Sequence, residues 1–208
     1  MPSLIAHWPQ ADQRALLDDL NYLNLAEMRT FCRAHAIPYA ICVETKTGEL
    51  RKTADTDRKS VVLARVRRYL KTGRVPQATC FPAHIVREDA LPKRLTPSDR
   101  LYYGHYEKHN PVMINLLKRL TDGRFRSGAL ARILAREFWS AGKAPTFAEF
   151  AAAWSRANPK GLGIADGLHP EAAWLTDRAR GTADKNWKAR RAQIAARVLK
   201  ALRTIPRP

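Results

Sequence analysis

Proline and glycine divide this chain into short segments. Its 208 residues include 13 prolines and 10 glycines, and apolar residues recur at helical spacing in the segments between them. No stretch approaches the roughly 18 consecutive apolar residues that are typical of a membrane-spanning helix. The pattern therefore predicts a mainly α protein that is made of short helices.

Two short amphipathic helices are expected in the first third of the chain. Asn24 precedes a run with helical apolar spacing, and Glu27 completes a capping box with it. This helix must end before Pro38, because the residue that precedes a proline is pushed out of the α region. Asp57 is expected to cap a second helix, from Arg58 to about Lys71.

The segment between these helices has the pattern of a β-hairpin. Ile41 and Val43 alternate with small or polar residues, and Thr47-Gly48 provides a turn. Residues 1–78 are therefore expected to form a small N-terminal helix-hairpin-helix unit.

The rest of the chain predicts a C-terminal helical bundle. Residues 79–96 are irregular, contain prolines and have mixed charges, which is typical of a linker, and residues 97–208 form the second domain. The expected helices of this domain are about Ser98–Lys108, Pro111–Thr121, Ser127–Ala141 and Thr146–Ala157, one that starts at Pro170, and a final one over Asp184–Thr204.

The charge of the chain is strongly positive. Lys and Arg number 37 against 19 Asp and Glu, which gives a formal net charge of +18. Such a field attracts nucleic acids, acidic lipid surfaces and acidic proteins over a Debye length of about 8 Å at physiological salt. The N-terminal residues lack the basic leader and apolar run of a secretory signal. We therefore expect a cytoplasmic, nucleoid-associated protein with no membrane partner.

The second expected helix has an apolar side and a basic side. On a helical wheel, the apolar side holds Val62, Leu63, Val66, Tyr69 and Leu70. The opposite side holds Arg65, Arg67, Arg68 and Lys71. From Arg58 to Arg74 the chain has seven basic residues and no acid, so pairs between neighbouring turns cannot neutralise these charges. The cations are expected to point outward and to meet phosphates.

These two helices resemble a known family. The residues that carry the resemblance are Leu-Ala-Glu-Met at 25–28, Phe-Cys-Arg at 31–33, Arg-Lys-Ser-Val-Val-Leu-Ala-Arg-Val at 58–66, and Tyr69-Leu70. The pattern is similar to that of the SAP domain and its bacterial SAP-like relatives, which fold as helix, extended segment and helix and bind DNA. In this match Lys59 and Arg65 take the positions of the family's lysine and arginine. Residues 103–157 are similar to an uncharacterised bacterial helical module.

The charge pattern and the resemblance together predict a non-enzymatic protein that binds double-stranded DNA. A short basic helix contacts mainly phosphates, so the binding is expected to be largely independent of sequence. The resemblance implies a preference for A·T-rich DNA. RNA is kept as an alternative partner, because it carries the same phosphate groups. The residues expected to contact nucleic acid are Arg58, Lys59, Arg65, Arg67, Arg68, Lys71, Lys188 and Arg191.

The last expected helix is a second basic element. Its cations surround an apolar line that includes Trp187, Val198 and Leu202. Three roles fit this pattern: contact with DNA phosphates, attachment to an acidic membrane surface, and packing on the second domain with the basic side in water.

Two other functions are compatible with the sequence. The basic face could bind an acidic protein, so that the chain would act as an adaptor or an inhibitor. Glu44 and Lys46 follow a strand-like run with the spacing of a metal-dependent nuclease core. The nearest preceding acids lie in expected helices, so a charged hairpin explains this pair better.

No catalytic residue, metal site or cofactor is expected. His105 and His109 are four residues apart and would share one face of a helix, but no third ligand lies nearby. The glycine-rich segment 161–167 lacks the Lys-Ser/Thr pair of a phosphate-binding loop. No nucleophile has a base beside it, and the three cysteines are expected to be buried, reduced thiols.

Overall fold

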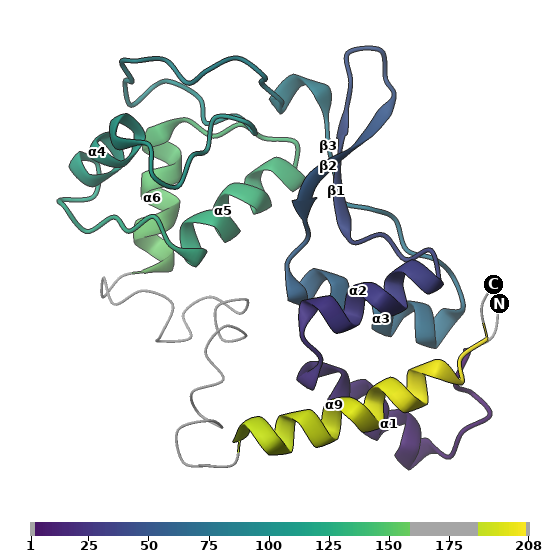
Figure 1. The fold of residues 1–208 in the computed structure, drawn as a ribbon. Helices are drawn as coiled ribbons and strands as arrows, with labels where there is room; N and C mark the ends of the chain where they lie inside the picture. The colour runs from purple at the N-terminus through teal and green to yellow at the C-terminus, as the bar shows by residue number, and fades with distance from the viewer. Residues whose placement is uncertain (1–2, 159–186, 207–208) are drawn as a thin grey trace. The chain divides into compact units, whose positions relative to one another are not determined.

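The computed structural model describes residues 3–158 and 187–206, and these form two compact units (Figure 1). The described part of unit 1 consists of residues 3–41, 52–79 and 187–206. The described part of unit 2 consists of residues 42–51 and 80–158. Within these ranges, every helix is too short or too polar to span a bilayer.

Unit 1 is built mainly from helices whose apolar sides face one another. They are α1 (Gln10–Asp19), the 3-10 turn η1 (Leu20–Tyr22), α2 (Leu25–Ala34), α3 (Lys59–Thr72) and α9 (Trp187–Arg203). α2 packs on α3, and α9 packs on both α1 and η1. The capping box expected at Asn24 and Glu27 is present and fixes the start of α2. Gly73 ends α3 in the left-handed conformation, with a φ of 64°.

A three-stranded sheet corrects the expected fold class. β1 (Ala40–Glu44) and β2 (Leu50–Thr56) form the predicted hairpin, and β3 (Cys80–Phe81) pairs with β1 in parallel, in the order β2-β1-β3. The prediction of a mainly α protein with a C-terminal helical bundle is therefore wrong, because the structure is mixed α/β. Two residues are too few to show the alternation by which a strand is recognised, so β3 could not be predicted from the sequence pattern.

Unit 1 includes a helix from the far end of the chain. α9 buries Ala195, Val198 and Leu202 and packs on α1 and η1. The sequence pattern placed this helix in the domain of residues 97–208, whereas the structure groups it with unit 1. An apolar line on a helix shows that the helix packs on something, but it does not show on which unit. The helix expected to start at Pro170 lies outside the described residues.

Unit 2 has an aromatic core. Its helices are α4 (Pro111–Arg119), α5 (Ala129–Ser140) and α6 (Phe147–Ala157), and a 3-10 turn, η2 (Ala83–Ile85), follows β3. The largest fully buried side chains of the unit are Phe81, Phe125, Phe147, Phe150 and Trp154. The predicted linker at 79–96 is therefore structured at its start, because Phe81 and Ile85 belong to this core.

The helix expected over Ser98–Lys108 is absent. Arg100 instead forms an antiparallel bridge with Thr146. Gly104 has a φ of 101°, and a Cβ at this position would lie 1.9 Å from the carbonyl oxygen of Arg87. A backbone with this conformation and this close approach is open only to glycine. Non-local pairing therefore overrides the local helical pattern.

Arg65 is the centre of a buried polar network in unit 1. Its Nη1 donates to Asp57 Oδ2 at 2.6 Å and to the Pro38 carbonyl at 3.0 Å. Its Nη2 donates to Thr79 Oγ1 at 2.7 Å, and that hydroxyl donates to Asp57 Oδ1 at 2.9 Å. One guanidinium group thus joins α3 to the two ends of the hairpin and to the segment before β3.

This network corrects two expectations. Asp57 does not cap α3, because the N-cap residue is Arg58, which makes no side-chain capping bond. Arg65 was expected to point away from the core, and this is wrong, because the residue is buried. Arg65 follows Val62 by three residues and precedes Tyr69 by four, so it borders the apolar side of the helix. Its long side chain turns inward, where a carboxylate compensates its charge.

Cys32 is fully buried in unit 1. Burial raises the pKa of its thiol to about 12, and the positive charge of Arg65 offsets only part of this effect. The described cysteines are all free: Cys32 and Cys42 are buried, as expected, and Cys80 is half-buried.

Replacing Asp57 by Asn tests the buried network. Asp57→Asn preserves the shape of the side chain but leaves the Arg65 guanidinium without its counter-charge, which should lower the free energy of unfolding by about 3–5 kcal/mol. Urea denaturation followed by circular dichroism measures this loss. Glu49→Gln removes an exposed carboxylate from the same hairpin and should change stability by at most about 0.5 kcal/mol. A loss as small as this in Asp57→Asn would show that the network does not hold unit 1.

The buried Cys32 thiol should make the protein sensitive to alkaline pH. Its pKa is higher in the folded state than in the unfolded state, so its contribution to stability is complete below about pH 9 and is lost as the pH rises toward 12. This group alone should lower the free energy of unfolding by about 1.4 kcal/mol per pH unit above pH 9. Denaturation at pH 8, 9 and 10 should therefore show a shallower decline in Cys32→Ala than in the native protein. Equal declines would contradict this assignment.

Candidate nucleic-acid interface

The cations of α3 differ in exposure. Arg68 and Lys71 are exposed and lie one helical turn apart, and Arg74 is exposed just after the helix ends. We call these three residues the α3 basic end. Their side chains have no hydrogen-bond or ion-pair partner among the described residues. The sequence prediction named Arg68 and Lys71 but omitted Arg74, although the same spacing of one turn continues to it.

The half-buried cations of α3 hold the helix in place. Arg67 Nε donates to the Leu17 carbonyl at 3.1 Å, and its Nη2 donates to Asn21 Oδ1 at 2.8 Å. Lys59 Nζ donates to the Asn21 carbonyl at 2.6 Å. Arg58 is half-buried at the N-cap position. The partners of Arg67 are neutral, so its charge still contributes to the positive field, but its Nε and Nη2 already have acceptors.

Arg191 of α9 is held by an internal ion pair. Its guanidinium pairs with the Glu27 carboxylate and donates from Nε to the Tyr22 carbonyl at 2.8 Å. Glu27 is also the acid of the capping box at the start of α2. Arg191 was expected to contact DNA, and the structure instead uses it to fasten α9 to the start of α2. The side chain of Lys188 lies outside the described part of the structure.

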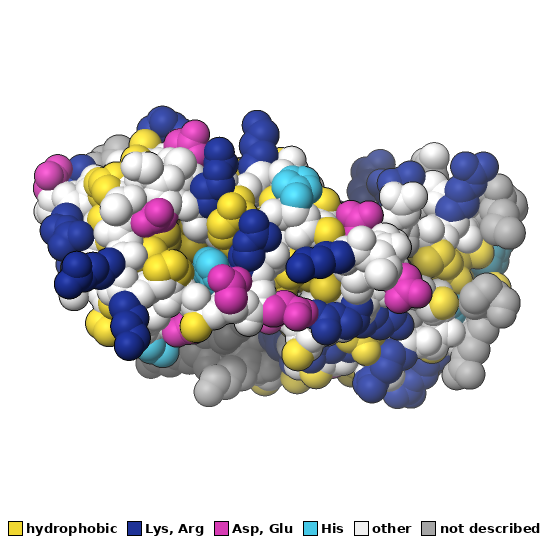
Figure 2. All heavy atoms as spheres, turned by 90° about the horizontal axis from the view of Figure 1, so that it is seen from above, with side chains coloured by type: hydrophobic (Ala, Val, Ile, Leu, Met, Phe, Trp, Pro, Cys, Tyr) yellow, Lys and Arg dark blue, Asp and Glu magenta, His cyan; other side chains and the backbone are white. Residues whose placement is uncertain are grey.

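The surface of the protein is rich in cations. Figure 2 shows one face, on which the Lys and Arg side chains (dark blue) outnumber those of Asp and Glu (magenta). Residues 58–79 contain no acid, and the carboxylate that precedes them, Asp57, is bound to Arg65 inside unit 1. The charge of the α3 basic end is therefore not neutralised by its own segment.

The two metal-binding motifs considered from the sequence are not assembled. Among the described residues, no group of three or more His, Cys, Asp or Glu side chains could hold a metal ion. His105 is buried, with its Nε2 3.4 Å from Asp89 Oδ1, whereas His109 is exposed. Glu44 Oε2 accepts from the Ala83 N–H at 3.4 Å. A hydrolytic metal site needs carboxylates that converge, and neither motif provides them here.

Comparison with known proteins adds no relative. No protein-family model matches the chain, and neither the curated proteins nor the solved structures contain a match. A function for this chain therefore has to be inferred from its own residues, above all from the exposed cations of α3 and the contacts that hold that helix.

Proposed function

We propose that this protein binds double-stranded DNA through the α3 basic end, without enzymatic activity and largely without sequence specificity. The observation that carries the proposal is the separation of the α3 cations. Arg65 is buried and paired, whereas the three residues of the basic end are exposed and have no partner in the described part of the chain. Such cations can meet phosphates without first breaking an internal contact.

The order of elements supports a SAP-like mode of binding. α2, an extended hairpin and α3 follow the helix, extended segment, helix order of that family, and α2 packs on α3. Lys59 and Arg65, which match the family's two cations, already have internal partners in this chain. We therefore assign the DNA contacts to the other end of α3, where the cations face water.

Contacts between the three cations of the α3 basic end and three phosphates would give weak binding that depends on the salt concentration. Each neutralised phosphate contributes about −0.9 to the slope of log K against log salt, so three contacts give about −2.7. Non-specific complexes of this kind have a Kd of about 10⁻⁴–10⁻⁶ M at physiological salt. Insertion of Arg68 into a narrow minor groove would add a preference for A·T-rich DNA. Binding of this type would also keep the protein on the nucleoid. RNA carries the same phosphate groups, so the α3 basic end would also bind RNA.

The double variant R68A/K71A tests the assigned face. It removes two of the three phosphate contacts, so the affinity for a fluorescein-labelled 20-base-pair duplex should fall by about tenfold or more at 100 mM salt. The salt slope should become less negative by about 1.8. Fluorescence anisotropy at several salt concentrations measures both quantities. Both side chains are exposed, so the melting temperature should remain nearly unchanged.

The matched control for this experiment is K118A/R119A. It removes two exposed cations from the last turn of α4 in unit 2 and lowers the net charge of the chain equally. DNA affinity should change much less in this control. Equal weakening in both variants would show that only the net charge matters, and an unchanged titration for R68A/K71A would rule out the assigned face.

A further inference from the structure

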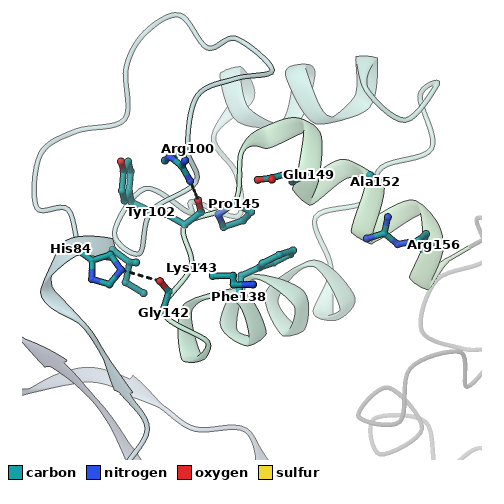
Figure 3. Close-up of a pocket in the computed structure, with 12 residues that line it drawn as sticks. His84, Arg100, Tyr102, Phe138, Gly142, Lys143, Pro145, Glu149, Ala152 and Arg156 are labelled. Carbon is teal, nitrogen blue, oxygen red and sulfur yellow. Dashed lines mark hydrogen bonds between the residues drawn. The ribbon is translucent and has the colours of Figure 1, made fainter.

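A hollow in unit 2 has the composition of an anion-binding pocket. Its volume is about 720 Å³, and it is bordered by α5, α6 and the irregular segment before α4 (Figure 3). Three cationic side chains line it, those of Arg100, Lys143 and Arg156. Glu149 is the one acid among its described lining residues. The pocket therefore carries a surplus of positive charge.

The backbone around Lys143 is fixed by contacts on both sides. His84 Nε2 lies 2.9 Å from the Gly142 carbonyl oxygen, and Arg100 Nη1 donates to the Ala144 carbonyl at 2.8 Å (Figure 3). Lys143 stands between these two carbonyls, in the connection from α5 to α6. The backbone that carries Lys143 is therefore fixed before any ligand binds, although the exposed side chain itself must still be ordered.

The positive charge of the pocket is not consumed by internal contacts. The side chains of Lys143 and Arg156 have no hydrogen-bond or ion-pair partner among the described residues. Glu149 caps α6, where it accepts from the Thr146 N–H at 2.7 Å. Hydrogen bonds to Thr146, and then the charges of Arg100 and Lys143, keep the pKa of this carboxyl below its usual value. Glu149 is thus held as a charged cap, and the cations of the pocket still outnumber it.

The size and the walls of the pocket favour a ligand larger than a phosphate ion. Its volume falls within the roughly 300–1,000 Å³ that is typical of small-molecule sites. Tyr102 and Phe138 line it, and both rings are half-buried. The Arg87 guanidinium lies 4.1 Å from the centre of the Tyr102 ring and covers one face of it. Phe138 is therefore the better surface for a flat aromatic group.

We propose that this pocket binds a nucleoside monophosphate, with the phosphate attracted by the positive charge that Arg100, Lys143 and Arg156 give to the pocket and the base against Phe138. A phosphate monoester carries between one and two negative charges at pH 7, which matches the surplus of cations. The same chemistry occurs in a free mononucleotide and at the phosphorylated end of a nucleic-acid strand. The site belongs to unit 2 and does not depend on the DNA contacts proposed for α3.

Isothermal titration calorimetry of the full chain with deoxyadenosine monophosphate tests the pocket. This nucleotide should bind about tenfold more tightly than deoxyadenosine or inorganic phosphate, because it alone carries both the base and the phosphate. The K143A/R156A variant removes two exposed side chains and should weaken nucleotide binding by about tenfold or more while the melting temperature stays nearly unchanged. K118A/R119A should bind the nucleotide as the native chain does. The assignment is overturned by equal loss in both variants, by equal affinity for inorganic phosphate, or by no nucleotide binding.

Competition in the R68A/K71A background identifies the source of the ligand. Two single-stranded oligonucleotides of one sequence, one with a 5′-phosphate and one with a 5′-hydroxyl, compete with deoxyadenosine monophosphate. Displacement by the phosphorylated strand alone supports the pocket and assigns it to strand ends. Displacement by neither strand supports the pocket and assigns it to the free nucleotide. Equal displacement by both strands would overturn the proposal, because an internal phosphodiester would then suffice.

Discussion

The buried ion pair of Arg65 and Asp57 is the contact on which unit 1 depends. An isolated charge in a protein interior costs several kcal/mol, so it is found there only with a counter-charge and with its hydrogen bonds satisfied. The guanidinium has a carboxylate, a carbonyl and a hydroxyl as partners, and they come from three separate segments. Apolar packing tolerates small shifts between segments, but this set of directed bonds does not. The pair therefore fixes the position of α3 relative to Pro38, Asp57 and Thr79 inside unit 1.

The same pair determines how the other cations of α3 are used. With Arg65 turned inward, Arg67 and Lys59 reach carbonyl and amide oxygens of the α1–η1 segment. Arg68 and Lys71 lie along the side that faces water, and Arg74 lies past the end of the helix. One basic helix thus contains both the residues that anchor it and the residues that are available to a polyanion. Charge alone does not distinguish these two groups, because all of them are Lys or Arg.

Local signals in the sequence predicted much of the secondary structure. The capping box predicted at the start of α2 is present, since such a motif needs only four consecutive residues. The hairpin was also predicted correctly, because its alternation and its Thr-Gly turn are local features. Features that depend on distant partners were missed. These include the parallel strand β3, the packing of α9 on α1, and the irregular course of the segment before α4.

In the candidate site, too, the local features could be predicted and the features that depend on distant residues could not. Exposed cations such as Arg68 follow from the helical wheel. The burial of Arg65 instead depends on Thr79 and on Asp57, which lie outside α3 and therefore outside its helical wheel. The pocket of unit 2 was not predicted, because its cations come from three separate segments and the segment of Arg100 was wrongly expected to be a helix.

The distribution of unit 1 along the chain affects the order in which the protein can fold during synthesis. α1 and η1 leave the ribosome before α9, which packs on them, and the whole of residues 80–186 is made in between. At roughly 5–20 residues per second, translation of residues 80–186 takes about 5–20 s. During that interval the apolar side of α1 has no covering helix, although unit 2 can already assemble. The nascent chain therefore exposes a surface suited to a chaperone, and unit 1 is completed only after the described part of unit 2 has been made.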